Sequence, residues 1–125
     1  MLLDSFYKIT QIETVAPQHF RVSVALEPEH PVYAGHFPGN PIVPGVCSLH
    51  MVAECAGKAL GCQVVMSQVS VVKFLGIVQP SSDKDLEIDL QISDEMALKA
   101  AIKSGERMVM SCKLRLQKMT SFLNH

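Results

Sequence analysis

The chain has 125 residues, of which 48% are hydrophobic and 18% charged, and its net charge is −1 at neutral pH. This length fits one domain that builds a core without disulfides, and no apolar run approaches the roughly 20 residues of a membrane-spanning helix. The four cysteines show no CxxC spacing, so neither a disulfide framework nor a metal site is predicted.

Composition also bears on compartment and partners. The first residues carry an acid at Asp4 and no long apolar core, so they do not read as a signal peptide, and we expect a cytoplasmic protein. The low charge content indicates an apolar surface that a second copy covers. Residues 96–125 hold six basic residues against one acid, Glu106. They form either a solvated strand face or a patch for an acidic partner. Few aromatic residues lie among these charges, which argues against nucleic-acid binding.

The N-terminal third predicts two paired strands. Residues 6–14 alternate loosely between apolar and polar, and a turn follows at Pro17. Residues 19–27 alternate cleanly, with Phe20, Val22, Val24 and Leu26 on one side.

A loop rich in proline and glycine then leads into a helix. Residues 35–45, GHFPGNPIVPG, contain three of the seven glycines and three of the seven prolines, a composition typical of loops that approach ligands closely. Pro44 fits the first turn of a helix that ends at Gly61. This helix is apolar nearly all round and is therefore predicted to be buried. Its predicted apolar stripe is Val46, Leu49, Ala53, Gly57 and Leu60, and its polar row is His50, Glu54 and Lys58.

The rest of the chain predicts four strands, over residues 64–78, 84–92, 96–103 and 107–117, with a hairpin turn at residues 104–106. Residues 96–103 have helix-forming composition, but their place before a tight turn favours a strand. The last strand is expected to turn Met108, Met110, Cys112, Leu114 and Leu116 inward, and residues 118–125 are expected to be frayed. The whole chain, residues 1–125, thus predicts one α+β domain with a helix against an antiparallel sheet. One helix cannot cover six strands, which again predicts a dimer.

The segment GHFPGNPIVPGV, the helix containing AECAG and the downstream VVKFLGIVQPSSDKDLEIDL together resemble the β-hydroxyacyl-acyl-carrier-protein dehydratases of fatty-acid synthesis. The resemblance covers about residues 5–117. It implies a hotdog fold, in which an antiparallel sheet wraps a long central helix, assembled as a homodimer or a trimer of dimers. It also implies active sites at the dimer interface, an apolar tunnel for an acyl chain carried by an acyl carrier protein, and no cofactor.

The same resemblance assigns residues to roles. His36 matches the family's catalytic histidine, and Gly45 matches the glycine whose N–H binds the thioester carbonyl. Phe37, Pro44 and Val46 fall at substrate-binding positions beside them. The family's acid lies fourteen residues after the histidine, a position that His50 occupies here. Glu54 stands one turn further on, where many members carry glutamine.

Dehydration of a 3-hydroxyacyl thioester needs a base, an acid and stabilisation of an enolate-like oxygen. His36 suits the base, because an imidazole titrates near neutral pH, and the helix N-terminus suits the oxygen. His50 could be the acid if it is protonated, and Glu54 could raise its proton affinity or replace it. Alternatively, this row is a polar seam that faces a partner subunit.

Three functions follow from the resemblance and its departure at His50. The first is dehydration of a 3-hydroxyacyl thioester on an acyl carrier protein to the trans-2-enoyl thioester. The second is a non-catalytic hotdog subunit that binds acyl chains or completes a heterodimer. The third is an acyl thioesterase.

Overall fold

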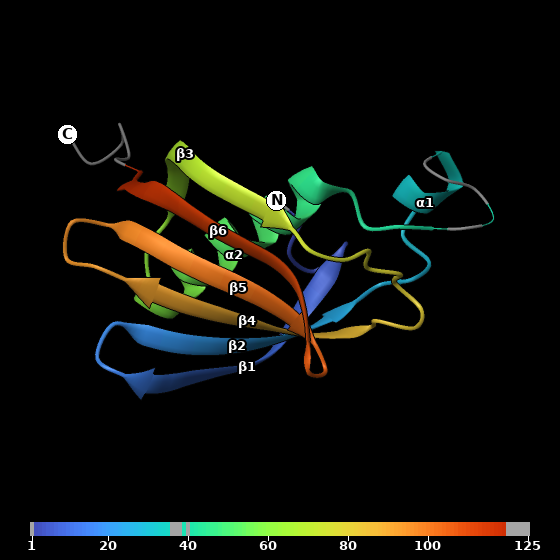
Figure 1. Cartoon of the computed structure of the whole chain (residues 1–125), viewed down its shortest axis with the longest axis horizontal. Helices are drawn as coiled ribbons and strands as arrows, with labels where there is room; N and C mark the ends of the chain where they lie inside the picture. The colour runs from blue at the N-terminus through green and yellow to red at the C-terminus, as the bar shows by residue number, and fades with distance from the viewer. Residues whose placement is uncertain (1, 36–38, 40, 120–125) are drawn as a thin grey trace.

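A six-stranded antiparallel sheet curves around one long helix, which lies behind the sheet in Figure 1. The computed structural model describes residues 2–35, 39 and 41–119. The strand order in the sheet is β1-β2-β4-β5-β6-β3, so β1 and β3 are its edges. The elements are β1 (Tyr7–Ala16), β2 (His19–Leu26), α1 (Val32–Gly35), α2 (Gly45–Leu60), β3 (Val64–Phe74), β4 (Asp85–Ile92), β5 (Ala97–Ser104) and β6 (Arg107–Lys118).

The predicted order of two strands, a helix and four strands is confirmed, and residues 96–103 do contain a strand. Two differences stand out. The four-residue helix α1 is not predicted, because so short a segment has no periodicity to read. The predicted strand over residues 64–78 ends at Phe74: the N–H groups of Leu75 and Gly76 both donate to the Val109 carbonyl, at 2.9 and 3.3 Å, and residues 75–78 run on as a connection.

The core lies between the inner face of the sheet and one side of α2. Strict alternation places Leu86, Ile88, Leu90 and Ile92 of β4 inward, as predicted. In β6 the predicted inward residues Met110, Cys112, Leu114 and Leu116 are buried, but at the start of the strand Met108 is 40% exposed and Val109 is buried instead. A register shift between Ile102 and Lys103 of β5 changes which residues of β6 face inward there.

The side of α2 that faces the core differs from the predicted stripe. Met51, Val52, Cys55 and Ala56 are fully buried, together with Ser48. The ends of the predicted stripe are open to solvent, because Val46 is 60% and Leu60 36% exposed. Ala53 and Gly57 are buried between these two sides. A helix that is apolar nearly all round does not reveal from its sequence which side meets the sheet.

The edge strand β3 leaves apolar side chains uncovered. Val65, Val69 and Val71 are all exposed along it, next to a free row of backbone N–H and C=O groups. Val46 and Leu60 add apolar surface on α2. One copy of the chain therefore leaves both an edge strand and one side of its helix unburied.

Some predictions concern the chain as a whole. Lys118 belongs to β6, so the predicted frayed tail begins too early, and residues 120–125 lie outside the described residues. All four cysteines are free; Cys55 and Cys112 are buried, and Cys47 and Cys62 partly so. Within the described part of the chain, no helix is long and apolar enough to cross a membrane. The same residues contain no cluster of His, Cys, Asp or Glu that could hold a metal ion.

Candidate functional site

The N-terminus of α2 carries backbone N–H groups without a side-chain cap. Pro44 is the N-cap residue, in extended geometry, and within the described residues no side chain caps this end. The N–H groups of Cys47 and Ser48 both donate to the Pro44 carbonyl, at 3.0 and 3.3 Å. The N–H groups of Gly45 and Val46 have no acceptor among the described residues. This helix end can therefore stabilise negative charge on a ligand oxygen.

Gly45 lies in contact with an aromatic ring. A Cβ atom at this position would lie 2.7 Å from Cζ of Phe74, which is too close. Glycine thus lets the Phe74 ring rest on the first residue of α2. Phe74, Leu75 and Ile77 each leave more than half of their surface exposed. The segment that follows β3 therefore forms an apolar surface beside the free N–H groups.

The predicted base, His36, and the predicted contact residue Phe37 lie outside the described residues. The segment before them is anchored in the core by Tyr33, which is buried and packs on the Phe6 ring at 5.8 Å between centroids. Burial raises the pKa of the Tyr33 hydroxyl to about 12. That hydroxyl has no hydrogen-bond partner in the described part of the chain. No sequence pattern predicts this anchor, because the four residues of α1 are too few to show a helical period.

His50 and Glu54 lie on consecutive turns of α2, as predicted, but their surroundings and contacts differ. His50 is exposed. The Glu54 carboxylate accepts hydrogen bonds from the backbone N–H groups of Leu2 and Leu3, at 2.9 and 3.2 Å, and from the Tyr7 hydroxyl at 3.0 Å. No hydrogen bond or ion pair joins His50 to Glu54. Glu54 therefore holds the N-terminal segment on α2.

The donors around Glu54 keep their protons. Tyr7 is completely buried. Burial, followed by the nearby Cys55 and Glu54, raises the pKa of its hydroxyl well above the ordinary value. Burial likewise raises the pKa of the Cys55 thiol to about 12, and its Sγ lies 3.9 Å from the Tyr7 oxygen. Tyr7 is thus a fixed donor to Glu54.

A groove of about 810 Å³ runs along the exposed side of α2, between the helix and the start of β3. His50 and Glu54 are part of its wall, with Val65 and Met66 on the β3 side. The groove therefore joins the polar row of the helix to the free edge of the sheet.

Comparison with known proteins places this architecture among dehydratases. A family model described as ApeI-like, ApeI dehydratase, matches residues 12–113. The chain is 32% identical over 86 residues to the 3-hydroxyacyl-[acyl-carrier-protein] dehydratase FabZ of Latilactobacillus sakei, which covers 61% of each chain. It is 32% identical over 91 residues to FabZ of Zymomonas mobilis, covering 65% of this chain and 58% of that protein. The chain thus spans about three fifths of the length of these relatives.

Solved structures confirm the hotdog fold. The dehydratase heterocomplex ApeI:P from Xenorhabdus doucetiae aligns with a TM-score of 0.75 at 23% identity, over 86% of this chain and 95% of that one. A hypothetical thioesterase with coenzyme A from Streptococcus pneumoniae aligns with a TM-score of 0.62 at 16% identity, over 92% and 87%. At these identities the likeness shows the fold alone.

Proposed function

The chain belongs to the ApeI-like dehydratase family, and on that premise we propose that it converts a 3-hydroxyacyl thioester on an acyl carrier protein to the trans-2-enoyl thioester. The observation that carries the proposal is the uncapped start of α2 beside an apolar surface. Negative charge develops on the thioester oxygen as the α-proton leaves. The Gly45 and Val46 N–H groups and the helix dipole would stabilise that charge.

In this mechanism His36 removes the α-proton. The C–H electron pair moves into the enolate, the bond from Cβ to the hydroxyl oxygen breaks, and the hydroxyl leaves as water with a proton from an acid. An imidazole suits the first step because its pKa lies near the working pH. Phe37, Pro44 and Val46 would contact the thioester and the first carbons of the acyl chain.

We assign the role of proton donor to His50. Glu54 instead has a positioning role, because it holds the N-terminal segment on α2. All three donors around Glu54 are satisfied by its carboxylate, which ties the helix to the N-terminal segment. His50 is exposed in a groove that is open along β3. A second copy paired at the β3 edge would close this groove, which fits a homodimer or a trimer of dimers with sites at the interface.

A non-catalytic or heterodimer-forming subunit is the second candidate. The observation that favours it is His50, which stands where the resemblance places a carboxylic acid. The solved structure named as the dehydratase heterocomplex ApeI:P adds support for pairing with a second chain.

Product analysis separates these functions. The purified chain is incubated with a 3-hydroxyacyl thioester on an acyl carrier protein, and the products are identified by mass spectrometry. The enoyl thioester is expected, and Lys84→Gln, an exposed change outside the groove beside α2, should form it as wild type does. Free acid would instead indicate a thioesterase. No product from the chain alone, with enoyl product after addition of a second hotdog subunit, would establish the heterodimer.

A further inference from the structure

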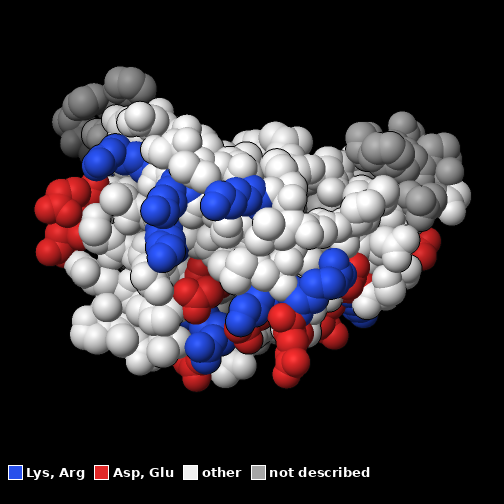
Figure 2. Space-filling model, viewed as in Figure 1, with Lys and Arg blue, Asp and Glu red and all other residues white. Residues whose placement is uncertain are grey.

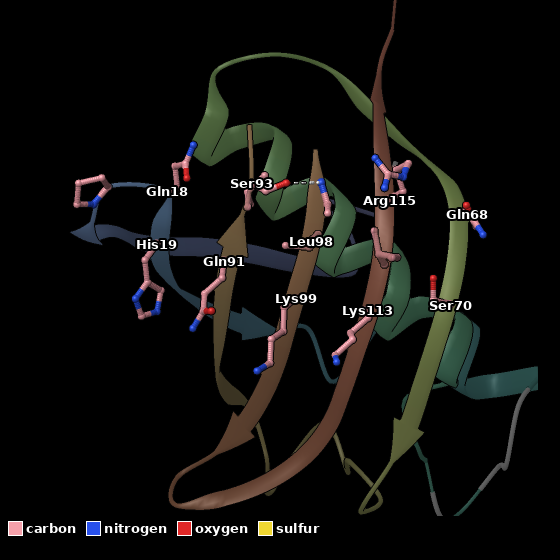
Figure 3. Close-up of a pocket in the computed structure, with 14 residues that line it drawn as sticks. Gln18, His19, Gln68, Ser70, Gln91, Ser93, Leu98, Lys99, Lys113 and Arg115 are labelled. Atoms are coloured by element: carbon pink, nitrogen blue, oxygen red, sulfur yellow. Dashed lines mark hydrogen bonds between the residues drawn. The ribbon is translucent and has the colours of Figure 1, made fainter. Parts of the chain in front are cut away.

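The outer face of the sheet, turned away from α2, carries a groove of about 830 Å³ that crosses β2, β4, β5, β6 and β3 (Figure 3). Three cations line it, Lys99, Lys113 and Arg115, and none of its described lining residues is Asp or Glu. Small outward residues such as Ala97 and Ser70 lie beside these long side chains, which leaves the space hollow. The groove is separate from the start of α2, where we place the chemistry.

Two of these cations face each other directly. Lys99 of β5 and Lys113 of β6 are register partners, and both side chains extend to the same side in Figure 3. Like charges directly opposite each other in an antiparallel pair destabilise the sheet. Neither lysine forms an ion pair with a described carboxylate. The sheet therefore keeps an uncompensated pair of positive charges at its centre.

The acidic groups nearest these lysines on the same face, Asp89 and Glu87, are already paired with other side chains, and the partner of Asp89 is His19 at the end of the groove. Asp89 of β4 pairs with His19 at 2.9 Å, and Glu87 pairs with Arg21 at 3.4 Å. Figure 2 shows Lys and Arg side chains across the upper middle of this face, with Asp and Glu at its left edge and both signs mixed along its lower part. The described lining of the groove contains cations of this face but no Asp or Glu.

We infer that this groove is a second binding site, for a soluble phosphate or diphosphate ester. Directly opposite residues have Cβ atoms about 5 Å apart, so the two flexible ammonium groups can converge on one phosphoryl dianion. Gln68 and Gln91 add neutral amide donors along the groove. A carboxylate ligand would favour the two-pronged guanidinium of Arg115. Part of that group is already engaged, because Nη1 donates to the Glu95 carbonyl at 3.0 Å. Lysine charge with amide donors therefore fits phosphate better than carboxylate.

The test is an NMR titration of the full chain with inorganic pyrophosphate at constant ionic strength. Saturable shifts are expected at the amides of Lys99, Lys113 and Arg115. The double variant Lys99→Gln/Lys113→Gln should bind at least tenfold more weakly. The matched variant Lys8→Gln/Lys84→Gln removes the same charge from two exposed lysines outside the groove and should bind within twofold of wild type.

Several outcomes would overturn the inference. These are shifts that never saturate, equal weakening in both double variants, or binding of citrate as tight as that of pyrophosphate. The chain could instead sediment with phosphatidylglycerol vesicles, and Lys99→Gln/Lys113→Gln, but not the matched variant, could abolish this. That result would point to a membrane surface and would also overturn the inference. Because the readout is binding, the result is independent of dehydratase activity, and Lys99→Gln/Lys113→Gln should form enoyl product at the wild-type rate.

Discussion

Replacement of Glu54 by alanine should destabilise the fold strongly, although the helix surface around it is partly exposed. The change removes the acceptor for the Leu2 and Leu3 N–H groups and for the Tyr7 hydroxyl. Tyr7 is completely buried, so its orphaned hydroxyl costs about 1–3 kcal/mol. The two backbone donors can turn to water and add less. We expect a total loss of about 2–4 kcal/mol in the free energy of unfolding.

Urea denaturation followed by circular dichroism at one fixed protein concentration measures this loss. The midpoint should fall by about 1–2 M for a chain of this size. Lys58→Ala, an exposed change on the next turn of α2, serves as the matched control and should stay within about 0.5 kcal/mol of wild type.

The variants Tyr7→Phe and Glu54→Ala, alone and combined, complete a double-mutant cycle with an expected coupling of about 0.5–3 kcal/mol. Equal stabilities of Glu54→Ala and Lys58→Ala, or strict additivity with Tyr7→Phe, would refute the anchoring role of Glu54.

Three further predictions concern other parts of the molecule. Gly45→Ala puts a methyl group against the exposed Phe74 ring, so it should cost only about 1 kcal/mol of stability in urea denaturation but lower the rate of enoyl formation at least tenfold; a rate within twofold of wild type would contradict the role of Gly45. Burial opposes ionisation of Asp83, but hydrogen bonds from the Gln79 N–H, Ser104 and Arg107 outweigh it and lower its pKa below the ordinary 3.8. Its charge therefore stabilises the fold above that value and ceases to do so as the pH falls through the lowered pKa. In thermal unfolding, Asp83→Asn should lose about 1–2 kcal/mol of stability at pH 7 and less below about pH 4. A difference from wild type that stays constant with pH would contradict this. His50→Glu restores the acid of the related enzymes and should preserve or raise turnover, whereas a loss of a hundredfold or more in the initial rate would show that the imidazole itself is required.

The strands were largely predictable because regular alternation decides which side of a strand faces the core, and β6 departs from it only at Met108, beside a register shift. Leu86, Ile88 and Leu90 follow that rule without exception. The helix was predictable in position, since Pro44 and Gly61 bound it, but not in orientation. Small and apolar residues occupy nearly the whole circumference of the helix. The side with Met51 and Cys55 packs on the sheet because of the shapes of the side chains, which the periodicity of the sequence does not reveal.

The contacts that define the candidate site depend on residues far apart in the chain. Spacing put Glu54 next to His50, but its partner is Tyr7, 47 positions away, and no local pattern could reveal that bond. The Lys99–Lys113 pair likewise needs the register of β5 against β6. The start of the helix was predicted to within one residue, because that signal is local: Pro44, expected in the first turn, is the N-cap residue, and α2 begins at Gly45.

The rate of enoyl formation by wild type and His36→Ala on one 3-hydroxyacyl acyl-carrier-protein thioester tests the central claim most directly. Both proteins are compared at the same folded concentration, with circular dichroism and scattering to show that fold and assembly are unchanged. If His36 removes the α-proton, wild type forms the enoyl thioester and the variant is slower by on the order of 10²–10⁴. A wild type that forms no enoyl product, or a His36→Ala rate within twofold of wild type, would contradict the account.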